Sequence, residues 1–110
     1  MAIDRSLVSG STSMLILKLL EEKDMYGYEM IEELEKRSEY VFSLKAGTMY
    51  PLLHAMESKK HLVSYEKEAQ GRYYTITKQG RAELLKKKEA WETYSKAVGQ
   101  VIGGALYGNA

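Results

Sequence analysis

Residues 62–77, LVSYEKEAQGRYYTIT, carry the clearest strand pattern in the chain. Both of its ends are rich in β-branched and aromatic residues that alternate with polar ones, which is the two-residue period of a strand. Two strands are therefore expected, over residues 62–67 and 72–76, joined by a short turn at Ala69–Gln70–Gly71 in which Gly71 is free to take a positive φ. Alternation sorts the second strand into an inner pair and an outer pair, Tyr74 with Ile76 and Tyr73 with Thr75.

Three helical stretches precede this hairpin. Residues 11–22 are apolar on nearly all sides, which predicts a central helix that other elements cover. Asp24 is a good N-cap for a second helix that runs to about Arg37. A third helix is expected over residues 45–60, and Pro51 inside it predicts a late start or a bend. The apolar residues at helical spacing along this third helix are Met49, Leu52, Leu53 and Met56.

A long helix is expected to follow the hairpin. Thr77 is placed to cap it, and it runs from Lys78 to about Gly103. At a rise of about 1.5 Å per residue it spans about 38 Å, which is more than so small a core can cover. Its apolar residues recur at heptad spacing, so it is expected to pair with a second copy of itself. The residues expected at that dimer interface are Leu84, Trp91, Tyr94, Val98, Val101 and Ile102.

Length and composition exclude several classes of protein. The chain has 110 residues, enough for one domain, and no cysteine, which excludes a disulfide scaffold, a thiolate zinc site and a catalytic thiol. His54 and His61 are too few for a histidine-rich metal site, and no catalytic or phosphate-cradling motif occurs. We therefore expect neither an enzyme nor a cofactor. The apolar runs are too short for a membrane span and unlike a signal peptide, which points to the cytoplasm.

Charge is unevenly distributed along the chain, although the net charge is +1. Residues 18–40 carry eight acids and four bases, whereas residues 41–88 carry ten bases and four acids. The basic segment is a candidate surface for a polyanion. Charge counts alone favour a simpler interpretation, in which these residues are solvated helix faces.

The order of elements indicates the fold class. Three helices, a two-stranded hairpin and a long helix make a mainly α winged helix-turn-helix with a C-terminal dimerisation helix. Residues 1–77 would form the winged helix-turn-helix and residues 78–110 the dimerisation helix and tail, within one structural unit. The recognition helix would lie at about 45–60 and the wing at about 62–76. This order does not by itself establish DNA binding.

Three motifs in this order resemble the PadR family of bacterial transcriptional regulators: YGYE at residues 26–29, LKAGTMYPLL at residues 44–53 and GRYYTITKQGR at residues 71–81. The similarity covers about residues 8–100. It implies that the second and third helices form a helix-turn-helix, that the third enters the major groove of double-stranded DNA, and that the wing touches backbone or minor groove. It also implies a homodimer held by the last helix, and a repressor that answers to a small, often aromatic, effector.

Two departures from the family pattern carry expectations of their own. His61 stands just after the third helix, where the family usually has a glycine and where a helix commonly ends on one left-handed residue. Because histidine takes that conformation less readily, we expect a strained or rearranged helix end. Only Arg72 stands before the paired tyrosines, where many relatives carry several bases. The wing should therefore make few phosphate contacts, and the third helix should supply more of the affinity.

The candidate DNA contacts lie on the third helix and the wing. Lys45 and Thr48 would sit near the helix N-terminus, which favours phosphate through its free N–H groups and its dipole. The Tyr50 hydroxyl is within reach of a phosphate or base edge, but its ring can equally pack on the second helix. For several of the candidate DNA contacts, an ordinary role as a surface residue is nearly as good an interpretation. The complete set is Lys45, Thr48, Tyr50, His54, Lys59, Arg72 and Tyr73.

Trp91 is the most informative apolar residue of the last helix. Its simplest role is to fill the dimer seam, but two symmetry-related tryptophans can also sandwich a flat aromatic effector, with Met14 and Tyr94 lining the same cavity. We therefore expect a DNA-binding repressor whose operator affinity depends on such an effector. Two alternatives stay open. One is a dimeric small-molecule sensor without specific DNA binding, and the other is a winged helix that binds another protein through its acidic second helix.

Overall fold

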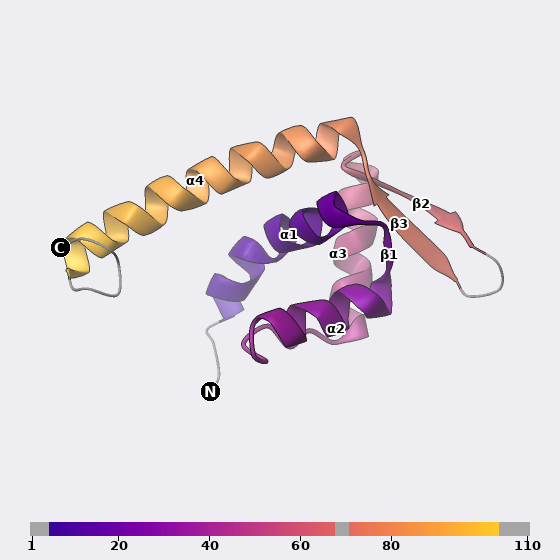
Figure 1. The fold of residues 1–110 in the computed structure, drawn as a ribbon, viewed down its shortest axis with the longest axis horizontal. Coiled ribbons are helices and arrows are strands. Elements are labelled where there is room, and N and C mark those ends of the chain that lie inside the picture. The colour runs from indigo at the N-terminus through magenta and orange to yellow at the C-terminus, as the bar shows by residue number, and fades with distance from the viewer. Residues whose placement is uncertain (1–4, 68–70, 104–110) are drawn as a thin grey trace.

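The molecule is built of four helices and a small sheet, in a computed structural model that describes residues 5–67 and 71–103 (Figure 1). α1 lies between α4 and α2, and the β2–β3 hairpin projects at one end. The order of elements is the predicted one, with one short strand added. The bounds are α1 Arg5–Glu22, β1 Met25–Tyr26, α2 Gly27–Arg37, α3 Ala46–Ser58, β2 Leu62–Glu66, β3 Arg72–Ile76 and α4 Lys78–Ile102.

α1 forms the centre of the core, as its apolar sequence predicts. Its buried residues point in several directions around the helix, so one neighbour is not enough to cover it. α4, β3 and α2 pack around it. The face predicted for the third helix is also confirmed, with Leu52 only half-buried at its edge. The largest buried apolar side chains are Ile16, Leu17, Leu19 and Leu20 of α1, Met30 of α2, Met49 and Leu53 of α3, Leu62 of β2 and Leu84 of α4.

The strands form an antiparallel sheet in the order β1-β3-β2, and β2 and β3 make the predicted hairpin. Tyr74 and Ile76 are buried on its inner face, so the alternation expected along the second strand is confirmed. Gly71 takes a φ of +101°, as expected for the end of the turn. The rest of the predicted turn, Ala69–Gln70, and residues 104–110 lie outside the described residues.

The start of α1 differs from the prediction, whereas α3 starts at the beginning of its predicted range. α1 begins at Arg5 and not at Ser11, because a helix tolerates an interior glycine such as Gly10 at a cost of about 1 kcal/mol. α3 begins at Ala46, so the late start that Pro51 was expected to impose is not observed. Pro51 lies on the exposed side of α3, where water can replace the backbone hydrogen bond that its ring removes.

α2 begins at Gly27 and not directly after Asp24, because Met25–Tyr26 pairs with β3 first. The helix start is completed from within, since the backbone N–H of Tyr26 donates to Glu29 Oε1 at 2.8 Å. The Asp24 carboxylate, predicted to be the cap, instead accepts a hydrogen bond from the Tyr65 hydroxyl at 3.0 Å. The two-residue strand therefore moves the cap from Asp24 to Tyr26.

α3 ends on a left-handed residue, but one position earlier than expected. Lys60 has a φ of +69°, and a Schellman motif closes the helix through the Lys60 N–H to the Glu57 carbonyl (2.9 Å) and the His61 N–H to the Met56 carbonyl (3.0 Å). The prediction was therefore wrong about the position, because the conformation that favours glycine falls on Lys60 and not on His61, and the helix ends in a regular motif.

The end of α3 is joined directly to the start of α4. Thr77 Oγ1 donates to the Lys60 carbonyl at 2.6 Å and accepts from the Gly80 N–H at 2.9 Å, which confirms its predicted role as the cap of the long helix. The Thr77 N–H also donates to the His61 carbonyl at 3.1 Å. A Cβ at Gly80 would overlap that carbonyl oxygen, so only glycine fits this close approach.

Candidate nucleic-acid interface

α3 turns one side to the core and the other to solvent. Its buried side carries Met49, Leu53 and Met56. Its exposed side includes small residues such as Gly47 and Ala55, which let another surface come close to the helix backbone. Apart from Tyr50, the predicted contacts that lie exposed on or beside this helix are Lys45, Thr48, His54 and Lys59. α3 therefore offers a narrow, polar ridge that nothing in the described chain covers.

Lys45 and Thr48 stand at the N-terminal end of this ridge. Lys45 is the N-cap of α3, and its carbonyl accepts from the Thr48 N–H at 2.9 Å. The N–H groups that open a helix have no partner inside it, and they carry the positive end of the helix dipole. The lysine ammonium adds a full positive charge to the same end. This end of α3 is thus suited to a phosphate group.

Tyr50 packs on the start of α2 while 41% of its surface is exposed. A Cβ at Gly27 would lie 2.6 Å from its Cε1, Cζ and hydroxyl oxygen, so the glycine makes room for this ring. Tyr50 therefore packs on the second helix, which is one of the two roles considered for it. The exposed part of the ring still borders the ridge.

Arg72 is exposed at the start of β3, and side-chain hydrogen bonds connect it to α3. Its Nη1 donates to Ser64 Oγ at 2.6 Å, and Ser64 Oγ donates to Glu57 Oε2 at 2.7 Å. Burial raises the pKa of the Tyr74 hydroxyl, the Glu57 carboxylate raises it further and the Arg72 guanidinium lowers it. The Arg72 guanidinium and the Glu57 carboxylate therefore shift the pKa of the same buried tyrosine in opposite directions.

Tyr73 points to the opposite face of the hairpin and joins a group of tyrosines. Its ring centroid lies 4.7 Å from that of Tyr26 and 5.5 Å from that of Tyr65, and Lys67 Nζ stands 4.5 Å from its centroid. Tyr26 stacks on Tyr28 at 5.6 Å. The structure therefore separates Tyr73 from the other predicted contacts, which lie on the α3 side.

Sequence reasoning missed Ser64, Glu57 and most of the tyrosine group. Alternation was a usable signal for Tyr65, since it lies opposite Tyr73 on the neighbouring strand. No comparable signal existed for Tyr26, because a two-residue strand is too short to show a period. The Ser64–Glu57 contact depends on how the chain turns between α3 and β2, and spacing alone does not reveal it.

The distal half of α4 exposes an apolar stripe. Val101 is 88% exposed, Tyr94 60% and Trp91 47%, with Ile102 also exposed and Val98 half-buried. Leu84 differs from the expectation for this seam. It is 1% exposed and belongs to the core of its own chain, so it has no surface left to bury against a partner.

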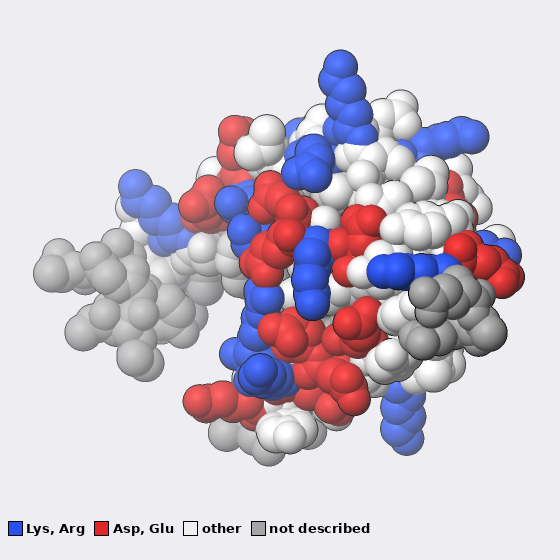
Figure 2. Space-filling view, turned by 45° about the vertical axis from the view of Figure 1, so that its right-hand side comes forward, with Lys and Arg blue, Asp and Glu red and all other residues white. Residues whose placement is uncertain are grey.

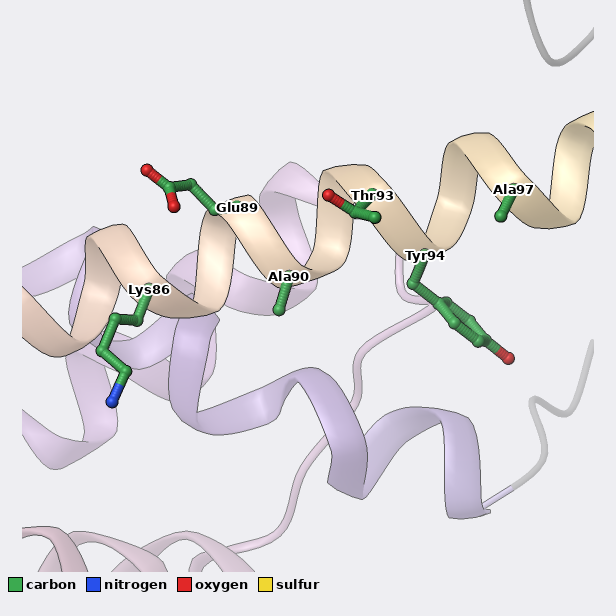
Figure 3. Close-up of a pocket in the computed structure, with 6 residues that line it drawn as sticks. All are labelled: Lys86, Glu89, Ala90, Thr93, Tyr94 and Ala97. Atoms are coloured by element: carbon green, nitrogen blue, oxygen red, sulfur yellow. The ribbon is translucent and has the colours of Figure 1, made fainter.

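An open hollow of about 610 Å³ lies along α4 (Figure 3). Its described lining residues all come from this one helix, so a second surface is needed to enclose a ligand there. Of the residues predicted to bind an effector, Tyr94 lines the hollow, and Trp91 lies beside it with ring centroids 6.3 Å apart. Met14 is half-buried and packs against the core instead. The lining residues are Lys86, Glu89, Ala90, Thr93, Tyr94 and Ala97.

Charged side chains of both signs are interspersed on the face seen in Figure 2. Acidic side chains gather near the middle of that face, with basic ones between and around them, so this face shows no continuous basic surface. Among the described residues, no group of three or more histidine, aspartate or glutamate side chains is arranged to hold a metal ion. No helix in the described part of the chain is long and apolar enough to cross a membrane.

Comparison with solved structures places this geometry among transcriptional regulators. A regulator from Clostridium thermocellum superimposes with a TM-score of 0.87 at 29% identity, over 93% of this chain and 100% of that one. A PadR family transcription regulator from Clostridium difficile gives a TM-score of 0.75 at 39% identity, over 84% of this chain and 99% of that one. Their overall fold is therefore that of the present chain.

Sequence comparison leads to the same group. A transcriptional regulator of Mycobacterium tuberculosis is 30% identical over 81% of this chain and 80% of its own length. A transcriptional regulator of Escherichia coli is 26% identical over 91% of this chain, which spans about half (49%) of that protein. Residues 16–86 match the transcriptional regulator PadR-like family, whose members are DNA-binding regulators of transcription and not enzymes. The chain belongs to the PadR-like family of transcriptional regulators.

Proposed function

We propose that the chain represses transcription as a homodimer that binds a pseudo-palindromic operator in double-stranded DNA. The observation that carries the proposal is the two-sidedness of α3, whose apolar side is fixed in the core while its polar ridge is free. Such a helix fits the major groove of B-DNA, with its N-terminal residues nearest the bases and phosphates. A protein of this kind acts in the cytoplasm, where bacterial DNA lies.

Different residues are assigned different parts of this interface. Lys45 and the N-terminus of α3 bind phosphate, Thr48 and His54 face the groove, and Arg72 adds one wing contact. Lys59 and the exposed edge of Tyr50 lie at the margins of the same ridge. Tyr73 is left out because its ring is engaged on the other face of the hairpin.

The test is fluorescence anisotropy with the DNA immediately upstream of the protein's own gene. Specific recognition predicts tight binding to that duplex, much weaker binding to a scrambled duplex, and a steep loss of affinity with salt. Lys45→Ala should weaken binding to both duplexes and reduce the salt slope by about one, as for the loss of one phosphate contact. Thr48→Ala should weaken operator binding by about tenfold, with little change on the scrambled duplex.

Lys96→Ala is the matched control, because Lys96 is an exposed lysine on the side of α4 away from the apolar stripe. It should leave both affinities and the dimer unchanged. Equal affinity of the wild type for native and scrambled DNA contradicts a specific operator at that place. Full affinity in Lys45→Ala and Thr48→Ala contradicts the assignment of α3.

We further propose that a flat aromatic effector between the two α4 helices lowers operator affinity. The exposed pair Trp91 and Tyr94 supports this, because rings from two copies can enclose a flat molecule. Titration with flat phenolic or cationic aromatic compounds should quench Trp91 fluorescence and release labelled operator in parallel. Quenching without release would instead favour a small-molecule sensor that acts without DNA.

A further inference from the structure

The wing and α3 are linked by a hydrogen-bond relay that none of the assignments above uses. Arg72 of β3 donates to Ser64 of β2, and Ser64 donates to Glu57 of α3, at 2.6 and 2.7 Å. We call these three side chains the wing relay. Both of its bonds involve a charged group, so each is stronger than a bond between neutral partners.

The relay has a fixed direction, because a serine hydroxyl has one proton to donate. That proton is directed at the Glu57 carboxylate, which leaves the oxygen lone pairs of Ser64 to accept from Arg72. Arginine has five N–H donors, and Ser64 takes up one of the two Nη groups. Arg72 remains an exposed residue, so other donors of its guanidinium are available to a ligand.

The relay also decides where the guanidinium stands. An exposed arginine samples many rotamers, and a phosphate contact must overcome the entropy that is lost when one of them is fixed. Arg72 shares the inner face of the hairpin with Ser64 and Tyr74, and this is the face that meets α3. A guanidinium held there is already ordered next to the C-terminal turns of α3.

We propose that Ser64 and Glu57 position Arg72 for its DNA contact, so that α3 and the wing engage DNA as one unit. This inference rests on the proposed DNA-binding function. Ser64 and Glu57 are positioning residues, since they act through Arg72 and not by contacting DNA themselves.

The relay predicts an effect of Glu57 on DNA affinity that is opposite to the effect expected from its charge. A carboxylate near DNA repels phosphate, so charge alone predicts that its removal tightens binding to any duplex. If Glu57 orients Ser64 and thereby Arg72, its removal weakens binding to the operator instead. Glu57→Ala should weaken operator binding by about threefold, whereas Glu57→Gln, which keeps an accepting oxygen without the charge, should bind at least as tightly as the wild type.

The decisive experiment is a double-mutant cycle on Ser64 and Arg72, read by operator anisotropy at several salt concentrations. Arg72→Ala should weaken binding about tenfold and lower the salt slope by about one. Ser64→Ala should weaken it about threefold, and Ser64→Thr, which keeps the hydroxyl on a strand residue, should restore it. In the Arg72→Ala background, Ser64→Ala should have no further effect.

Thr75→Ala is the control, because it removes a hydroxyl from the same hairpin but from its outer face. It should leave the affinity and the salt slope unchanged. Losses that multiply in the double variant, or tighter operator binding by Glu57→Ala, would overturn the relay while leaving the α3 assignment intact. A wild type that does not distinguish native from scrambled DNA overturns both the proposed function and the relay.

Discussion

The two ends of α4 have opposite surroundings although they belong to one continuous helix. At its start, Gly80 and Leu84 are buried against the rest of the chain. Toward its end, Tyr94 and Val101 are largely exposed, and nothing in the described chain lies over them. The first end closes a fold that is complete in one chain, whereas the second displays apolar surface that a single chain leaves in water.

The difference shows that heptad spacing does not tell which copy of the chain covers a residue. Leu84 and Trp91 are one heptad apart, yet one is in the core and the other is 47% exposed. Burying a large apolar side chain is worth about 1.5–3 kcal/mol, so the exposed stripe is a strong candidate for a second copy. The division between the folded unit and the surface that we propose for dimerisation therefore falls within α4, after Leu84.

The largest expected effect comes from breaking the exposed end. The double variant Tyr94→Glu/Val101→Glu places two acids on the stripe, where neither side chain supports the fold of its own chain. A dimer should become a monomer at micromolar concentration in sedimentation equilibrium, and operator affinity should fall at least about 100-fold because two half-sites are no longer read together. The thermal unfolding of the folded unit should change little.

Leu85→Glu provides the matched control for this variant. Leu85 is 62% exposed on the same helix, but on the side away from the stripe. The substitution adds an acid in place of an exposed apolar residue, as in the test variant. A double variant that stays dimeric, or a Leu85→Glu protein that dissociates equally, would contradict the assignment of the stripe.

Gly80→Ala tests the buried end, with the next largest effect. The new Cβ would overlap the His61 carbonyl oxygen, which is backbone and held by the Thr77 N–H, so it cannot move aside easily. We expect a loss of about 2–3 kcal/mol in the free energy of unfolding, measured by urea titration. Gly47→Ala is the matched control, since nothing lies within 4 Å of its added Cβ, and it should stabilise the protein by about 0.5–1 kcal/mol. A Gly80→Ala protein as stable as the wild type would show that the α3–α4 junction is not closely packed.

The buried half of the molecule was also the half that sequence reasoning predicted best. The apolar face of α3, the hairpin alternation and the Thr77 cap all follow from short-range patterns. Features that depend on tertiary contacts were misplaced or missed. Asp24 does not cap α2, because the two-residue strand Met25–Tyr26 lies between them. The Glu57–Ser64 hydrogen bond forms only because α3 and β2 pack together. The exposed stripe was predicted in outline, but Leu84 was wrongly included in it.

The smallest expected effect concerns an ion-pair group that joins α1 to α2 at the surface. Arg37 donates through Nη1 and Nη2 to the two carboxylate oxygens of Glu22, at 3.0 and 2.5 Å, and through Nε to Glu33 at 2.8 Å. These hydrogen bonds hold the pKa of both carboxyls below the ordinary value, although partial burial opposes the shift. The group is exposed, so solvent and salt screen it strongly.

Arg37→Met removes this charge while keeping an apolar stem on α2. It tests whether the stability of the folded unit depends on these surface ion pairs in addition to its core. A carboxyl whose pKa is lowered by folding stabilises the native state above its unfolded pKa, and this stability is lost as the pH falls through its folded pKa. The variant should therefore melt a few degrees lower at neutral pH and low salt, and the difference should shrink as the pH falls through the lowered pKa values of the two carboxyls, or as salt is added. Lys36→Met, which removes the neighbouring charge without breaking the group, should melt close to the wild type. If the Arg37→Met difference persists in acid, the lost stability comes from packing of the arginine stem and not from its charge.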